Sequence, residues 1–262
     1  MPDYANETIR LLEERASVRA FIPDSITEPE REIITSAALR APNGGKMSKF
    51  SLIDVREPAL KEKLAALCDS QRFIASAPGV YVILADYSRW FRLFRKYVRT
   101  LGVDINIPRE DELLLSAVDA LLAAENMVIA AQSLGIGSCF IADIIINHRQ
   151  IKELFALPKY VMPVTLCVFG RPAAPPKGRT PRIDAPVVHR DRYDELPDER
   201  LLDMIRPLVP RGADGEPVMS AEEYVGRYYV RRLGSWLSFE RARSVHAMFE
   251  DWLKSPYPGQ QT

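Results

Sequence analysis

The sequence has no excess of either charge, and it lacks the motifs that mark the common metal and nucleotide sites. Lysine plus arginine and aspartate plus glutamate number 35 each in 262 residues, which gives a formal net charge of +0 at pH 7. This balance gives no support to a general polyanion-binding surface, so we expect no nucleic-acid partner. The histidines number only 3 and lie far apart, and no glycine-rich dinucleotide or phosphate-loop motif is present. The sequence therefore predicts no metal site.

Cysteines are also few. Cys68, Cys139 and Cys167 are an odd number and are widely spaced, and two of them lie in apolar, strand-like runs. This pattern favours buried, reduced thiols over disulfides, metal ligands or catalytic nucleophiles. The first residues lack a basic region followed by an apolar stretch, and charged or polar residues interrupt the longest apolar helix. We therefore expect a cytoplasmic protein with no membrane partner.

The longest apolar stretch runs over residues 112–143. Its leucines, valines, isoleucine and methionine leave no wide polar face, so we expect a helix that is buried nearly all round and ends at Gly135 in a left-handed cap. A narrow seam of small or polar side chains, where another backbone can approach closely, recurs at steps of three and four residues: Ser116, Asp119, Ala123, Asn126, Ala130 and Ser133. A short strand at 139–141 and a turn at 142–143 follow, and the N–H groups of that turn are free to meet a ligand.

The remaining elements follow from periodicity, capping residues and turn residues. We expect strands at 50–55, 80–84 and 161–170, and helices at 8–15, 28–40, 58–68, 89–99, 148–157, 198–206 and 221–254. The last of these helices carries many aromatic residues, so it is expected to pack against its own domain or against a second subunit.

Two segments combine charge with a second pattern. In Arg15-Ala16-Ser17-Val18-Arg19 the alternation places two cations and a hydroxyl on one side of an extended chain and Val18 on the other; a solvated edge of alternating charge is the alternative. Residues 89–99 interleave basic and aromatic side chains, as some single-stranded nucleic-acid binders do. A helix with an aromatic inner side and a cationic outer side explains the same residues, and the absence of net positive charge favours it.

Three longer motifs occur in a fixed order: Arg15–Phe21 followed by Ile26, then Ala41–Gly45, then Leu122–Glu125 with Ala131–Ser138. Together they resemble the nitroreductase family of flavin-dependent oxidoreductases. Further stretches are similar to the family's branch of major oxygen-insensitive nitroreductases and flavin reductases: Gln71 after a polar turn, Ala85–Arg89, Leu157–Pro163, and Pro181-Arg182 before Val187–His189. The resemblance covers residues 5–195 and thins over the C-terminal helices.

The resemblance implies an α+β fold with a mainly antiparallel sheet flanked by helices. It also implies an intertwined homodimer that holds FMN at the dimer interface. Residues 1–200 are then expected to form the FMN-binding nitroreductase-like domain, and residues 201–262 a C-terminal helical extension that packs on the core or on the partner subunit.

Carried over residue by residue, the resemblance implies an FMN site. Arg15, Arg179 and Arg182 would meet the phosphate, where guanidinium groups form charge-assisted bonds. Ser17 and Arg19 would lie along the ribityl chain and the pyrimidine edge, and Asn43 with Gly44 would come from the partner subunit. Gln71 would bond the polar edge of the ring, and the N–H groups of Ala142 and Asp143 would face N5 and O4. The full expected set is Arg15, Ala16, Ser17, Val18, Arg19, Asn43, Gly44, Gln71, Phe140, Ile141, Ala142, Asp143, Arg179 and Arg182.

The sequence departs from that branch at two places. It has Arg179-Thr180-Pro181-Arg182 where Lys-Pro-Arg is usual, and it has Asp143 where a second glycine is usual. A carboxylate near N5 either repels an anionic substrate or points to solvent.

The implied reaction is ping-pong hydride transfer. NAD(P)H reduces FMN and leaves, and a small aromatic electron acceptor, a nitroaromatic or a quinone, then occupies the same side of the flavin. FMN supplies the hydride chemistry, so no catalytic side chain is expected. The alternatives are other FMN chemistry on the same fold, such as dehalogenation, ene reduction or flavin fragmentation, and a helical dimer that acts as a binding module without flavin.

Overall fold

The computed structural model describes residues 4–174 and 187–254, with the side chain of residue 99 left out. The chain divides into two compact units, Met1–Lys177 with Glu240–Thr262, and Gly178–Phe239. Each unit is described by itself below.

The first unit is built on one antiparallel sheet. Its strands are β1 (Phe50–Asp54), β2 (Gly79–Asp86), β3 (Gly137–Ile141) and β4 (Val161–Gly170), in the order β1-β2-β4-β3. Every residue of the central strand β2 is buried, as its continuous apolar sequence predicts for a strand covered on both faces. β3 lies at the edge of the sheet, which leaves its outer side open to another segment.

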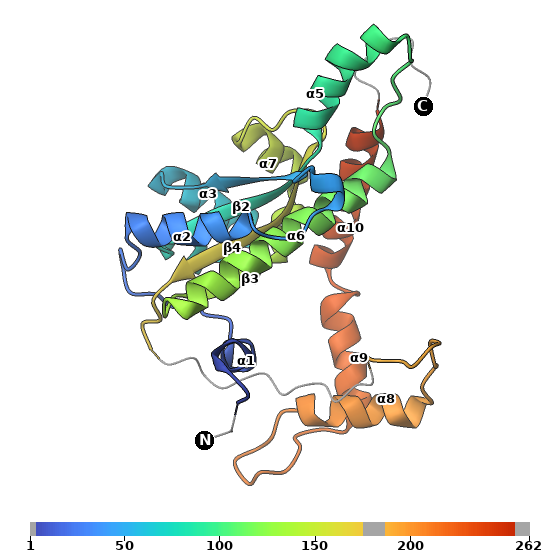
Figure 1. Ribbon diagram of the computed structural model, residues 1–262. Coiled ribbons are helices and arrows are strands. Elements are labelled where there is room, and N and C mark those ends of the chain that lie inside the picture. The colour runs from blue at the N-terminus through green and yellow to red at the C-terminus, as the bar shows by residue number, and fades with distance from the viewer. Residues whose placement is uncertain (1–3, 175–186, 255–262) are drawn as a thin grey trace. The chain divides into compact units, whose positions relative to one another are not determined.

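Helices cover both faces of this sheet (Figure 1). The helices of the first unit are α1 (Glu7–Glu14), α2 (Glu28–Ala38), η1 (Gly44–Lys46), α3 (Pro58–Leu67), α4 (Phe73–Ser76), α5 (Ser88–Tyr97), η2 (Val98–Leu101), α6 (Glu110–Ser133), η3 (Ala142–Ile145), α7 (His148–Leu154) and most of α10 (Trp236–Leu253). The predicted α+β class is confirmed, with an antiparallel four-stranded sheet flanked by helices.

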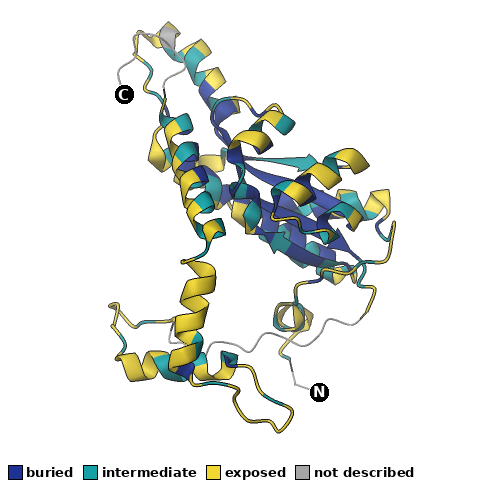
Figure 2. Ribbon diagram, turned by 180° about the vertical axis from the view of Figure 1, so that it is seen from behind, coloured by how far each residue is buried: buried dark blue, intermediate teal, exposed yellow. Residues whose placement is uncertain are grey.

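The alternation of side chains along β2 divides the core into two layers. Val80 and Val82 point to the face covered by α3, α4, η3 and α7, whereas Tyr81 and Ile83 point to the face covered by α2 and α6. Figure 2 shows that the buried residues are concentrated along the strands. A third cluster joins α5, the start of α6 and α10 through Phe91, Leu113, Tyr160, Met248 and Trp252.

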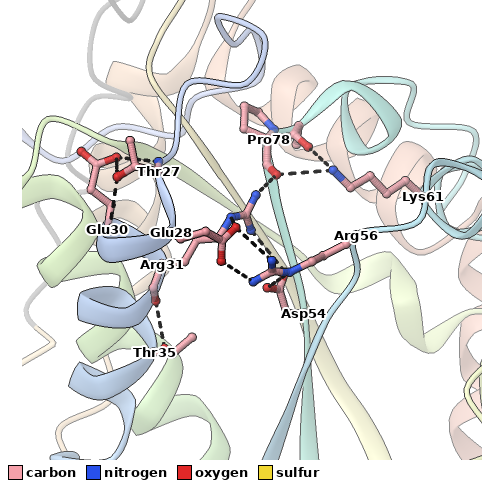
Figure 3. Close-up of polar contacts among 10 residues, drawn as sticks. Thr27, Glu28, Glu30, Arg31, Thr35, Asp54, Arg56, Lys61 and Pro78 are labelled. Carbon is pink, nitrogen blue, oxygen red and sulfur yellow. Dashed lines mark hydrogen bonds and ion pairs between the residues drawn. The ribbon is translucent and has the colours of Figure 1, made fainter.

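Polar contacts fix α2 to the sheet (Figure 3). The predicted capping box is present, because Thr27 accepts from the Glu30 N–H and the Glu30 carboxylate accepts from the Thr27 N–H. Further along the helix, Arg31 donates to the carbonyl of Pro78 at 2.6 Å and to the carboxylate of Asp54 at 3.3 Å. The helix is therefore tied both to the end of β1 and to the residue before β2.

The long helix α6 differs from its prediction. The expected left-handed cap is present, with Gly135 at φ +71°, but burial nearly all round is wrong for the chain by itself. The seam faces inward, where Ser116, Asp119 and Ala123 are buried and Asn126 donates to the Ala37 carbonyl of α2. The opposite face is open, and its apolar side chains are 39–65% exposed: Leu114, Leu115, Val118, Leu121 and Leu122. Apolar periodicity does not reveal whether the partner of a face lies in the same chain.

Among the described residues, α6 is also the one helix long and apolar enough to cross a membrane. In this fold its inner face packs against α2 and the sheet, so it serves as a core helix.

The predicted helix over residues 221–254 is two helices. α9 (Ala221–Arg232) ends at Leu233, and the Gly234 N–H donates to the Tyr229 carbonyl. The Ser235 hydroxyl then accepts from the N–H of Ser238 at 3.3 Å, which starts α10. The sequence prediction missed this break between the two helices, although Gly234-Ser235 is a local turn signal for it.

The second unit holds α8 (Asp198–Ile205), η4 (Arg206–Leu208) and α9. Arg231 and Arg232 of α9 lie over the ring of Tyr228. The expected domain boundary at residue 200 stays a prediction.

Candidate functional site

The segment over residues 15–22 adds to the edge of the sheet in an extended conformation. The Val18 N–H donates to the Ser138 carbonyl of β3 at 2.9 Å, and Ser17 forms a parallel bridge with Ser138. Further along, the Ile22 N–H donates to the Arg171 carbonyl at 2.9 Å, just after β4. The segment therefore crosses from the start of β3 to the end of β4.

Gly137 makes this docking possible. A Cβ atom at Gly137 would lie 2.4 Å from Cγ2 of Val18, a distance at which something must shift. Because no side chain occupies that position, Val18 packs there and is only 6% exposed. The predicted alternation holds, since Arg15, Ser17 and Arg19 are all exposed. The glycine of one motif and the valine of another are thus parts of one contact.

The three exposed polar residues gather around the thiol of Cys139. Burial raises the pKa of Cys139, and Arg19, Ser17 and Arg15 each act in the opposite direction. Neither Arg15 nor Arg19 forms an ion pair with a carboxylate anywhere in residues 4–174 or 187–254. This leaves two guanidinium groups beside a hydroxyl, which is a suitable donor set for a phosphate or another anion.

A second polar group lies at the other end of β3, where the strand passes into η3. Nε2 of Gln71 donates to Oδ2 of Asp143 at 2.8 Å and to the Cys68 carbonyl at 2.9 Å. On the other side, Nη1 of Arg241 lies 3.9 Å from Oδ1 of Asp143. The structure therefore brings together two of the predicted residues, Gln71 and Asp143, and it adds Arg241, which is not among the predicted FMN-binding residues.

Asn43 and Gly44 belong to a different part of the chain, the loop between α2 and β1. The Gly44 N–H donates to Oδ1 of Asp119 and the Lys49 N–H to Oδ2, both at 3.0 Å. Oδ1 of Asn43 accepts from the N–H of Ser48 at 3.1 Å. Asp119, which the sequence assigned to the seam, thus anchors this loop to α6.

The other predicted residues are placed as follows. Ala16 and Phe140 are half-buried, Ile141 is buried, and Ala142 is exposed. Arg179 and Arg182 lie outside the described residues. The β3 edge therefore carries the predicted residues 15–19, 71 and 140–143, and the loop on α6 carries residues 43 and 44.

A model of the nitroreductase family matches residues 12–171. The chain belongs to this family. An oxygen-insensitive NADPH nitroreductase of Salmonella typhimurium is 34% identical over 196 residues, which cover 74% of this chain and 78% of that protein. An NADPH-flavin oxidoreductase of Vibrio harveyi is 29% identical over 192 residues, which cover 73% of this chain and 76% of that protein. The crystal structure of nitroreductase A from Vibrio parahaemolyticus shares the fold, with a TM-score of 0.79, 22% identity, and coverage of 94% of this chain and 98% of that one.

This chain is thus a nitroreductase-family NAD(P)H oxidoreductase. The family uses a flavin and NAD(P)H. The described residues fit an FMN group. Among them, the guanidinium groups of Arg15 and Arg19 have no carboxylate partner and suit an anionic ligand at the start of β3, and Gln71 adds a polar group at the end of β3.

Proposed function

We propose that the protein is an FMN-dependent NAD(P)H oxidoreductase that reduces nitroaromatics or quinones by ping-pong hydride transfer. One observation carries this proposal, namely that Arg15 and Arg19 flank Ser17 beside Cys139 and have no carboxylate partner within residues 4–174 and 187–254. The nitroreductase and flavin oxidoreductase activities named for the relatives point to the same reaction class.

In this proposal FMN, when bound, supplies the hydride chemistry. Arg15 binds the phosphate, together with Arg179 and Arg182, which lie outside the described residues. Ser17 and Arg19 bind the ribityl chain and the pyrimidine edge of the ring. Gln71 bonds the polar edge of the ring, and the backbone N–H groups of Ala142 and Asp143 orient it.

We further propose that the working form is a homodimer in the cytoplasm. The open apolar face of α6, from Leu114 to Leu122, is a surface that a second copy would cover. We also propose that Asn43 and Gly44, in the loop that the Gly44–Asp119 hydrogen bond ties to α6, contribute to the FMN site of the partner subunit. The three cysteines are free and buried, as expected for a reducing compartment. A fully flavinylated monomer in light scattering would contradict the dimer.

Binding and kinetics test the function in two steps. Purified protein should be yellow, or should become so when titrated with FMN, and stopped-flow mixing with NADH or NADPH should bleach the flavin absorbance. A panel of acceptors should then restore the absorbance, with nitroaromatics and quinones ahead of halogenated phenols and activated alkenes. Colourless protein that ignores added FMN would overturn the proposal in favour of a binding module, and a preference for halogenated or alkene substrates would redirect it to other FMN chemistry.

A further inference from the structure

The side chain of Asp143 is held from two sides and does not point freely into solvent. Its Oδ2 atom accepts from Nε2 of Gln71 at 2.8 Å, and its Oδ1 atom lies 3.9 Å from Nη1 of Arg241. The side chains of Asp143 and Arg241 are 26% and 27% exposed, so solvent screens both charges only in part. The carboxylate therefore occupies a defined position where β3 ends.

The amide of Gln71 has one possible orientation in this arrangement. Its Nε2 atom also donates to the Cys68 carbonyl at 2.9 Å, and both of its partners are acceptors only. A flipped amide would place its oxygen against two oxygens, so the orientation follows from the chemistry of the partners. The electrostatic reach of Asp143 is visible at Cys68, whose pKa burial raises to about 12 with a second contribution from this carboxylate.

The two partners of Asp143 are not equivalent. The hydrogen bond from Gln71 fixes the carboxylate but leaves its charge in place, because an amide is neutral. Arg241 carries the opposite charge, yet at 3.9 Å it lies at the outer limit of an ion pair. The local potential is thus a difference between two fixed charges, one on η3 and one on α10.

We propose that this pair sets the charge beside the flavin, and that Asp143 is the specificity-determining residue that selects against anionic electron acceptors. The inference rests on the proposed function, since it assumes FMN along β3. Its consequence is that the two members of the pair have opposite effects. Loss of Asp143 leaves Arg241 unopposed, whereas loss of Arg241 leaves the carboxylate unopposed.

The test uses Asp143→Asn, Arg241→Gln and the double variant, all saturated with FMN. Asparagine keeps an acceptor for Gln71 and removes only the charge. The probes are 4-nitrobenzoate and its neutral analogue 4-nitrobenzamide, and their affinities for the oxidised protein are read from the flavin absorbance. Asp143→Asn should strengthen 4-nitrobenzoate binding by about fivefold and leave 4-nitrobenzamide within about twofold, because a unit charge a few ångströms away in a partly screened site has an effect of this size. Arg241→Gln should weaken 4-nitrobenzoate binding, and the double variant should lie between the two.

The flavin reduction potential gives a readout that needs no acceptor. Reduction adds negative charge to the ring, so Asp143→Asn should raise the potential and Arg241→Gln should lower it. A fivefold change in the relative affinity for reduced and oxidised flavin corresponds to about 20 mV. Glu28→Gln in α2, which lies on the opposite face of the sheet from η3, removes an exposed carboxylate paired with Arg56 and should change neither readout.

The outcomes separate the two proposals. Failure of the wild-type protein to bind FMN overturns the proposed function and this inference together. FMN binding with an unchanged preference between the two probes overturns this inference alone. Shifts of the same sign in both single variants, accompanied by weaker FMN binding, would show that the pair only holds structure.

Discussion

The two ends of β3 differ in whether their charged side chains have partners in the protein. At the start of the strand, Arg15 and Arg19 are held by backbone contacts and have no carboxylate partner among the described residues. At its end, Asp143 has an amide on one side and a guanidinium on the other. Charges without protein partners are available to a ligand, whereas partnered charges define shape and local potential. We therefore expect the first end to supply most of the affinity for FMN and the second end to tune what the bound flavin does.

The largest effect on the first end of β3 is expected when Gly137 is replaced by a residue with a side chain. In Gly137→Ala the new Cβ would lie 2.4 Å from Cγ2 of Val18, so the segment over residues 15–19 must shift away from β3. Overpacking of this kind costs about 1–3 kcal/mol of unfolding free energy. The affinity for FMN should also fall steeply, because Arg15, Ser17 and Arg19 would shift with the segment. Urea unfolding and FMN titration check the two effects.

Two variants control for this prediction. Gly137→Ala combined with Val18→Ala should recover part of the stability and of the FMN affinity, since the smaller side chain removes the contact at 2.4 Å and leaves only the Cβ of residue 18 at 2.9 Å. Gly226→Ala in α9 meets nothing within 4 Å and should stabilise the helix slightly. If Gly137→Ala binds FMN as tightly as the wild type, the segment does not need its contact with β3.

The next largest effect concerns Arg15, the proposed phosphate ligand. Arg15→Ala removes a charge-assisted bond of about 1.5–3 kcal/mol, so FMN affinity should fall about tenfold to a hundredfold. Riboflavin has no phosphate, and its affinity should change little. Fluorescence titration with both ligands measures the difference.

Arg10 is a matched control in the preceding helix. Its guanidinium is exposed but paired with Glu7 and Glu14, so Arg10→Ala should leave FMN affinity unchanged. Equal losses for FMN and riboflavin in Arg15→Ala would mean that Arg15 holds structure instead of phosphate.

The sequence predicted one end of this comparison better than the other. Alternation over residues 15–19 is a local pattern, and the side of the segment that each residue takes follows from the geometry of an extended chain. The contact of Asp143 with Arg241 joins residues 98 positions apart, and no local pattern encodes it. The same limit explains α6, whose cap at Gly135 was predicted from one residue, whereas its open and closed faces depend on where α2 and the sheet pack.

A smaller effect is expected at Arg19, which we place near the pyrimidine edge of the ring. Two-electron reduction leaves negative charge there, so a fixed guanidinium stabilises reduced flavin more than oxidised flavin. In Arg19→Met a loss of about 2 kcal/mol of differential stabilisation would lower the two-electron potential by roughly 40 mV. Reduction by NAD(P)H should slow, while reoxidation by the acceptor should not.

Arg19→Lys sharpens that result, because the charge survives although the planar fork does not, and it should recover part of the potential. Spectroelectrochemistry on FMN-saturated protein is the measurement. A potential within error of the wild type in Arg19→Met would remove Arg19 from the site.

The smallest expected effect is a pH dependence of stability that arises near the second end of β3 and not at the first. The arginines at the first end do not titrate near neutral pH. The chain beyond the second end continues through η3 to His148, whose backbone N–H donates to the Ser244 hydroxyl of α10 at 3.1 Å. Its Nδ1 atom is buried without a hydrogen-bond partner in the described part of the chain. Burial lowers the pKa of His148 below its ordinary value of about 6.5, and the carboxylate of Asp251, 3.9 Å away, offsets this only in part.

The direction of the pH effect follows from where the proton binds first. Below about pH 6.5 the unfolded chain binds a proton at His148 more readily than the folded chain does. The contribution of His148 to the free energy of unfolding is therefore fully present above that pH, and it is lost as the pH falls toward the folded pKa. Urea unfolding at pH 7.5 and pH 5.5 should show this decline in the wild type and a smaller one in His148→Gln. His246→Gln, on an exposed part of α10, should behave like the wild type. Equal slopes in all three proteins would show that His148 does not make the α7–α10 contact sensitive to pH.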